Sequence, residues 1–67
     1  MEYTKEELIE AKRQIDSTLH KLIKTMETFE SKENPNRYKS QITLAKRRVK
    51  AFSIANSFIE EALEELD

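Results

Sequence analysis

The fold is decided by residues 38–66, which read YKSQITLAKRRVKAFSIANSFIEEALEEL. Apolar and aromatic side chains recur there at alternating steps of three and four residues: Tyr38, Ile42, Ala45, Val49, Phe52, Ile59, Leu63 and Leu66. The one interruption of this row is Asn56. Such spacing is typical of a helix that packs lengthwise on a second helix. We therefore expect a long helix with one seam facing a neighbour.

A second apolar row runs along the same helix, and its members are Leu44, Ala51, Ala55, Phe58 and Ala62. At about 100° per residue, the two rows together span roughly 200° of the helix surface. One neighbouring helix cannot cover so wide an arc. The second row therefore predicts a further partner.

Composition limits the class of protein. The 67 residues leave room for a single domain, residues 1–67, with a small core. The chain contains no cysteine and no glycine, and its one proline is Pro35. Disulfides, thiolate metal sites and glycine-rich phosphate loops are thus excluded, and a mostly helical chain is expected.

The sequence favours a soluble, cytoplasmic protein. No apolar run approaches the roughly 20 residues of a membrane span, and the first seven residues contain no apolar signal segment. Charged residues make up 37% of the chain, but the formal net charge is only −1. Any attraction to nucleic acid or anionic lipid must therefore be local.

The first helix is predicted to begin at Thr4, because Thr4-Lys5-Glu6-Glu7 has the form of a capping box. Its seam consists of Leu8, Ile15, Leu19, Leu22, Met26 and Phe29, with Ile9, Ile23 and Ala11 on the flanks. The pattern fades near Ser31. Asn34-Pro35 then favours a restart, with Asn34 as the N-cap and proline at the first helical position.

These signals predict an all-α fold, a two-helix antiparallel hairpin over about residues 4–31 and 35–66. Pairing the helices about the short loop places Phe29 near Tyr38 and Leu8 near Ile59. We expect two such hairpins to dimerise into a four-helix bundle.

The same pairing predicts a polar layer of Lys12, Asp16 and Asn56. Lys12 and Asn56 are the only polar residues on the two seams, and Asp16 lies one turn beyond Lys12. In this interpretation the Asn56 carbonyl accepts from the Lys12 ammonium, Asp16 neutralises the charge, and the layer fixes register. The alternative is that Lys12 snorkels outward and Asn56 lies at a wet margin.

Charge favours an antiparallel homodimer. Residues 1–10 carry a net −3 and residues 60–67 a net −5, whereas the residues between them carry +7. Antiparallel packing would bring these opposite charges together. The predicted dimer interface consists of Leu44, Arg48, Ala51, Ala55, Phe58 and Ala62, and a different protein partner would be an alternative cover for it.

The alternative function is a nucleic-acid-binding regulator. Six basic residues lie between positions 37 and 50, and Lys46, Arg47 and Lys50 are the candidates for phosphate contacts. The other interpretation of these cations is a solvated helix face, which is the usual role of such runs. The sequence therefore favours a small structural or protein-interaction module.

An enzyme is not expected. His20, the only histidine, lies off the seam between Asp16 and Lys24 and is expected at the surface. The Glu-x-x-His spacing of a di-iron bundle is missing, and the serines have no histidine partner at helical spacing. We expect no cofactor, no catalytic residue and no metal site.

Two resemblances accompany these patterns. The run from Arg37 to Arg48, with Ala51, Ile54, Ala55, Phe58 and Ile59, resembles small two-helix proteins of Gram-positive bacteria, which implies no activity. In length and layout alone, the predicted dimer of hairpins resembles the ROP family of plasmid RNA-binding regulators.

Overall fold

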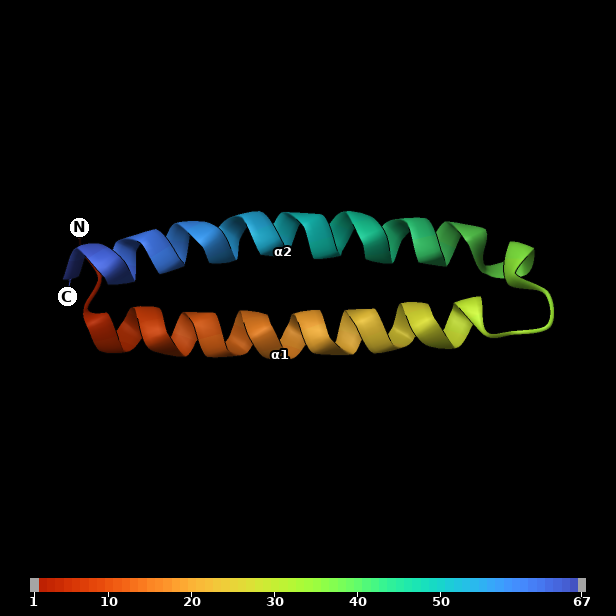
Figure 1. Ribbon diagram of the computed structural model, residues 1–67, viewed down its shortest axis with the longest axis horizontal. Coiled ribbons are helices and arrows are strands. Elements are labelled where there is room, and N and C mark those ends of the chain that lie inside the picture. Colours follow the sequence, from red (N-terminus) through yellow and green to blue (C-terminus); the bar gives the residue numbers. More distant parts are fainter. Residues whose placement is uncertain (1, 67) are drawn as a thin grey trace.

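The computed structural model describes residues 2–66 and consists of two long helices joined by a short loop (Figure 1). The first helix, α1, spans Lys5–Glu30, and the second, α2, spans Lys39–Leu66. A 3₁₀ turn, η1, at Pro35–Tyr38 leads directly into α2. The predicted all-α hairpin is confirmed, and none of the described residues forms a strand.

The start of α1 is stabilised by the predicted capping box. The Glu7 amide donates to Thr4 Oγ1 at 3.1 Å, and the Thr4 amide donates to Glu7 Oε1 at 3.0 Å. These bonds satisfy donors that the first turn of a helix leaves free. At the other end the Ser31 amide donates to the Glu27 carbonyl at 3.0 Å, so α1 ends within one residue of the predicted position.

The restart of the chain differs from the prediction in its first turn. Pro35 holds the first position, as expected, but residues 35–38 form a 3₁₀ turn and the α-helix begins only at Lys39. The Asn34 side chain makes no capping hydrogen bond; instead the Asn34 carbonyl accepts from the Arg37 amide at 3.0 Å. Short 3₁₀ turns are common where a chain enters an α-helix from a tight connection.

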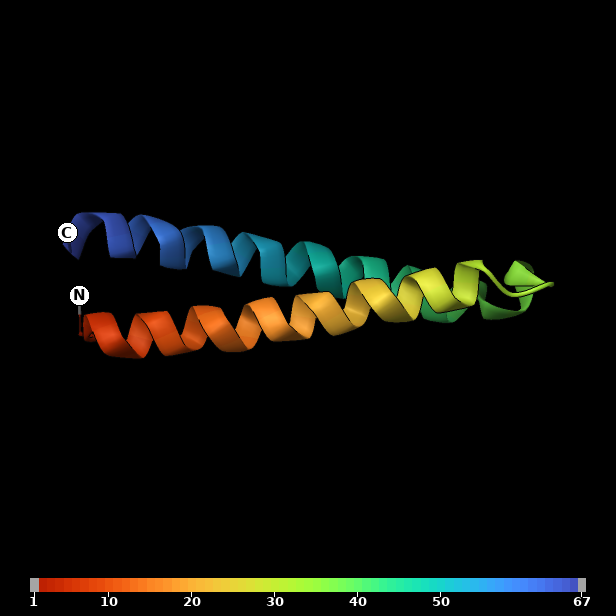
Figure 2. The ribbon, with the colours of Figure 1, turned by 60° about the horizontal axis from the view of Figure 1, so that its bottom comes forward.

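The two helices lie side by side along their whole length in Figure 1 and cross at a shallow angle in Figure 2. The molecule measures 48 × 15 × 14 Å, with a radius of gyration of 15.2 Å. A compact domain of this length would have a radius of gyration of about 11 Å. The chain is therefore a rod two helices wide, without room for a central core.

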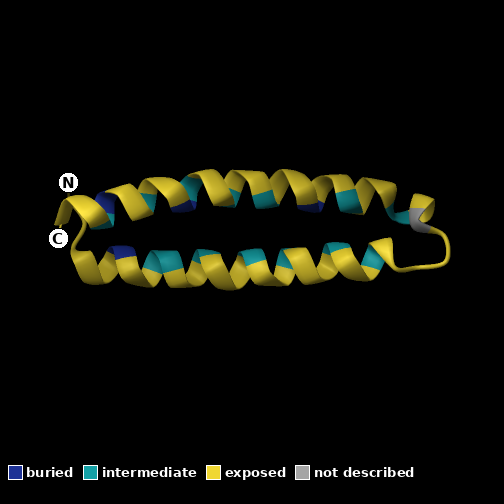
Figure 3. Cartoon of the chain, in the orientation of Figure 1, coloured by how far each residue is buried: buried dark blue, intermediate teal, exposed yellow. Residues whose placement is uncertain are grey.

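The register of the hairpin agrees with the predicted pairing. The rings of Phe29 and Tyr38 stack at the loop end, with their centroids 4.9 Å apart. At the open end, Leu8 and Ile59 line the same small pocket. Buried and half-buried residues follow the facing sides of both helices as one line (Figure 3).

The core along this line is thin. Only Leu8, Ala45 and Ala62 among the described apolar residues are buried, and no described side chain is fully enclosed. Most of the predicted seam residues are half-buried, while Leu66 at the end of α2 is exposed, contrary to its predicted place on the seam. The hairpin alone therefore removes little apolar surface from water.

The second apolar row is split between two environments, which corrects the prediction that a lone hairpin leaves all of it in water. Ala62 is only 6% exposed and Ala55 is half-buried, so both belong to the contact with α1. An α-helix drifts about 20° per heptad against a 3.5-residue repeat. Over the three heptads from Ile42 to Leu63, the face of α2 that meets α1 therefore turns toward Ala55 and Ala62.

Candidate interaction surface

The side of α2 that faces away from α1 carries an exposed apolar stripe. Phe58 is 65% exposed, Ile54 48% and Leu44 47%, and Ala51 between them is exposed as well. With Arg47 these residues repeat at steps of three and four, and we call Leu44, Arg47, Ala51, Ile54 and Phe58 the outer stripe. Its centre lies roughly 145° round the helix from the seam with α1, at about 100° per residue. Exposed apolar residues in one row mark a surface for a partner.

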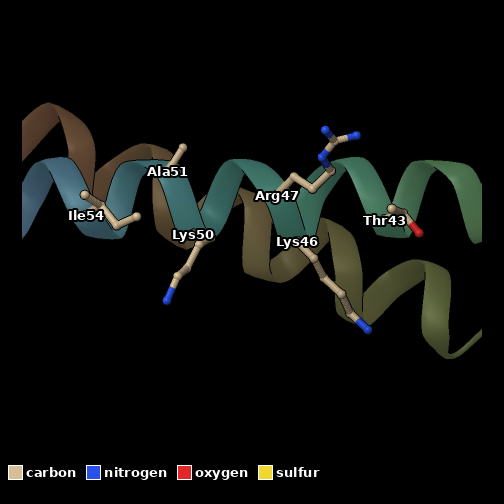
Figure 4. Close-up of a pocket in the computed structure, with 6 residues that line it drawn as sticks. All are labelled: Thr43, Lys46, Arg47, Lys50, Ala51 and Ile54. Carbon is tan, nitrogen blue, oxygen red and sulfur yellow. The ribbon is translucent and has the colours of Figure 1, made fainter.

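Sequence reasoning missed Ile54 and placed Arg47 elsewhere. The structure puts Thr43, Lys46, Arg47, Lys50, Ala51 and Ile54 around one shallow groove (Figure 4). In that view Arg47 and Ala51 project to one side of α2, and Lys46 and Lys50 project to the other. The three cations predicted to act together on phosphate therefore do not form one ridge. The heptad spacing of Leu44, Arg47, Ala51, Ile54 and Phe58 was the available signal for the stripe.

Arg48, predicted at the dimer interface, is exposed on α2 but lies outside the groove. Within residues 2–66, Lys46, Arg47, Arg48 and Lys50 make no ion pair or hydrogen bond through their side chains. The positive charge of this segment is therefore available to an acidic partner.

Charge is sorted along α2. All its basic residues lie within 39–50, the nine residues 51–59 carry no charge, and four glutamates follow at 60, 61, 64 and 65. The stripe thus runs from a basic half, across an uncharged centre, to an acidic end. Such a surface is complementary to a reversed copy of itself.

The three residues predicted to form a polar layer lie close together, and the bonds between them differ from the predicted ones. Asn56 Nδ2 donates to Asp16 Oδ1 at 2.8 Å, and the Lys12 ammonium contacts Asp16 Oδ2 at 3.1 Å. Lys12 also reaches Glu60 Oε1 at 3.1 Å, a partner that the predicted layer did not include. Lys12 therefore bridges the two helices, since Asp16 lies on α1 and Glu60 on α2.

Asn56 is the only buried polar residue among those described, at 9% exposure. Its Oδ1 atom, expected to accept from Lys12, is buried and has no hydrogen-bond partner in the described part of the chain. A buried carbonyl without a donor destabilises a fold by about 1–3 kcal/mol. The layer therefore lowers the stability of the hairpin through this carbonyl. At the same time, the bond between Asn56 and Asp16 specifies which residues of the two helices face each other.

The two carboxylates raise the pKa of the Lys12 ammonium above its ordinary value. The hydrogen bond to Glu60 makes the largest contribution, followed by the bond to Asp16, while desolvation acts in the opposite direction. Both bonds favour the charged amine. Lys12 is therefore held as a cation in the layer.

A metal-binding constellation is not found in residues 2–66. His20 is exposed on α1, as expected, and no group of three acidic, histidine or cysteine side chains is placed to hold a metal ion. No described helix is long and apolar enough to span a bilayer. The outer stripe is thus the strongest candidate site in the structure.

Comparisons with known protein families, with curated proteins and with solved structures found no match. The two resemblances noted from the sequence accordingly stay interpretations of sequence and layout.

Proposed function

We propose that the protein is a small structural or protein-interaction module that works as a homodimer through the outer stripe of α2. The observation that carries this proposal is the imbalance between the thin core of the hairpin and the apolar surface that it leaves in water. Chains of this size seldom reach adequate stability from such a core without oligomerisation.

Burial of the outer stripe would supply the missing apolar contact. Burial of a fully exposed large side chain is worth roughly 1.5–3 kcal/mol. Phe58, Ile54 and Leu44 are about half exposed in the hairpin, so each would gain about half of that value. A two-fold dimer gains each contribution twice. The gain is comparable with the 5–15 kcal/mol by which most domains are stable, in order of magnitude.

The orientation is antiparallel because α2 is basic in its first half and acidic at its end. Two hairpins then form a four-helix assembly. Since the outer stripe points away from α1, the two α2 helices lie at its centre and each α1 lies on the outside. The four-helix bundle expected from the sequence is accordingly a flat arrangement with the helices in the order α1, α2, α2, α1.

Sedimentation of the unmodified protein tests the proposal directly. A dimer is expected at micromolar concentration, and Phe58→Glu is expected to give a monomer or an unfolded chain, because it places a charge in the interface. Ser53→Glu is the control, since Ser53 is exposed and lies off the stripe in the same uncharged segment. A stable monomer of the unmodified protein at high micromolar concentration would contradict homodimerisation.

A second candidate, a nucleic-acid-binding regulator, is supported by Lys46 and Lys50 on one side of α2, whose ammonium groups have no ion pair within residues 2–66. It predicts binding of a short RNA or DNA duplex at low salt that weakens as salt rises. Lys46→Glu with Lys50→Glu should abolish this binding, and the slope against log salt should fall by about one for each phosphate that the variant no longer binds. Absence of binding at low salt rules this candidate out.

A further inference from the structure

Arg47 occupies an unusual position, because it interrupts an otherwise apolar stripe. It lies between Leu44 and Ala51 on the face of α2 that is turned away from α1. Its guanidinium has no ion pair or hydrogen bond within residues 2–66. A cation at such a position is stabilised by an aromatic or acidic group on whatever covers the stripe.

We propose that Arg47 sets the register of the homodimer by packing on Phe58 of the partner subunit, with Glu61 of the partner subunit one turn away. This inference rests on the proposed antiparallel dimer and deepens it. The two-fold axis crosses α2 at the level between Phe52 and Ser53, although neither of these side chains belongs to the outer stripe. Each chain supplies both halves of the contact, so the dimer contains it twice.

The register follows from the heptad spacing of the stripe. In an antiparallel helix pair, residues at equal distances on either side of the two-fold axis face each other. With the axis between Phe52 and Ser53, Ala51 meets Ile54 of the partner subunit at the centre. The next layer outward joins Arg47 to Phe58, and the outermost joins Leu44 to Glu61. The small side chain of Ala51 allows the helices to approach where the larger Ile54 must fit.

Charge selects this register over its neighbours. It places residues 39–50 of one α2 opposite residues 55–66 of the other, so that all the basic residues of α2 face the segment with its four glutamates. An axis moved to Val49 would set Phe58 against Ser40 of the partner subunit. An axis moved to Asn56 would leave Leu44 beyond the end of the partner helix. Only the central axis keeps every residue of the stripe opposite the partner helix and also sets the basic residues against all four glutamates.

The proposed contact between Arg47 and Phe58 of the partner subunit also explains why the cation on the outer stripe is an arginine and not a lysine. A planar guanidinium can lie on an aromatic ring and still direct its donors toward a carboxylate. In the proposed register Glu61 of the partner subunit is that carboxylate. Phe58, the most exposed large apolar side chain of α2, thereby gains a specific partner.

Disulfide trapping tests the register, and the absence of native cysteine makes the experiment clean. A disulfide requires Cα atoms within about 7 Å of each other. A mixture of Leu44→Cys and Glu61→Cys proteins should form the mixed disulfide under mild oxidation, and neither variant should cross-link with itself. Leu44→Cys with Ile54→Cys is the matched mixture for the axis at Val49 and should react much more slowly.

Each other outcome has a definite meaning. Self-cross-linking of Leu44→Cys overturns the proposed register, since it requires a parallel dimer or an axis at Leu44, and preferential linkage to Ile54→Cys overturns the central axis. A dimer by sedimentation that cross-links in none of these mixtures places the interface elsewhere and also overturns the inference. If the unmodified protein is a monomer, the proposed function itself fails.

The role of Arg47 is tested separately by comparing Arg47→Gln with Lys46→Gln, which remove the same charge from adjacent positions. Arg47→Gln should raise the dimer dissociation constant about 2- to 25-fold. Lys46→Gln should change it by less than about twofold, because Lys46 projects away from the stripe. Equal effects of the two substitutions would show that only net charge matters and would overturn the contact with Phe58.

Discussion

The inner face and the outer face of α2 have the same alternating spacing of three and four residues, but within residues 2–66 only the inner face packs on another helix. On the inner face Ala45 and Ala62 are buried, whereas on the outer face Leu44 and Phe58 are exposed. Periodicity therefore identifies a surface that packs on a helix without saying which helix covers it. In this protein the covered face forms the hairpin, and the uncovered face is where we place the second copy.

The largest expected effect comes from shortening one leucine for each face of α2: Leu8, which packs against the inner face, and Leu44, which lies on the outer face. Leu8→Ala should lower the free energy of unfolding by about 2–4 kcal/mol, because Leu8 is buried against α2 and its removal leaves a cavity. Leu44→Ala should instead weaken dimerisation and leave the helicity of the isolated hairpin unchanged. Denaturant unfolding at several protein concentrations distinguishes the two effects, because only the contribution of dimerisation to the free energy of unfolding depends on protein concentration. Equal, concentration-independent losses would mean that both leucines belong to one core.

A smaller effect is expected in the polar layer of the inner face. Asn56→Leu removes a buried carbonyl without a donor, so it should raise the free energy of unfolding by about 1 kcal/mol. The same change should loosen the alignment of the helices or the choice of oligomer, because it removes the bond to Asp16. Thermal unfolding together with sedimentation measures both outcomes. Unfolding of the variant would contradict the idea that the layer reduces stability.

Local chemistry explains what the sequence predicted well. The capping box at Thr4 and Glu7 involves neighbours in the chain, so its bonds could be inferred from spacing alone. The stacking of Phe29 on Tyr38 followed from the shortness of the loop, which leaves few ways to pair the helices. Both features depend on contacts that the order of residues nearly determines.

Features that depend on helix rotation or side-chain reach were harder to predict. Ala62 is buried because the face of α2 that contacts α1 turns along the helix. The two apolar rows of the sequence, in contrast, predict that each face keeps one direction. Glu60 joined the polar layer because the long Lys12 side chain reaches one turn beyond Asn56. Arg47 was grouped with Lys46 by sequence proximity, although the two side chains project to different sides of α2.

The smallest expected effect is the pH dependence of the stabilisation that Lys12 provides through its contacts with Asp16 and Glu60 in the polar layer. The pKa of Lys12 in the folded chain is raised above the ordinary value of 10.5 by Glu60 and Asp16. The folded state therefore keeps its proton to higher pH than the unfolded state does. The stabilisation is fully present below pH 10.5 and is lost as the pH rises through the raised pKa.

The comparison of the unmodified protein with Lys12→Met isolates this contribution, because methionine keeps the length of the side chain without its charge. Their difference in free energy of unfolding should be constant from neutral pH to about pH 10 and should then shrink, since the unfolded chain loses its proton first. Lys24→Met on α1 is the matched control, because Lys24 is exposed and its side chain makes no ion pair within residues 2–66. That control should show no such decline. If the Lys12 difference instead stayed constant through this range, the bridge from Asp16 to Glu60 would not stabilise the charged amine, and Lys12 would behave as a solvated residue like Lys24.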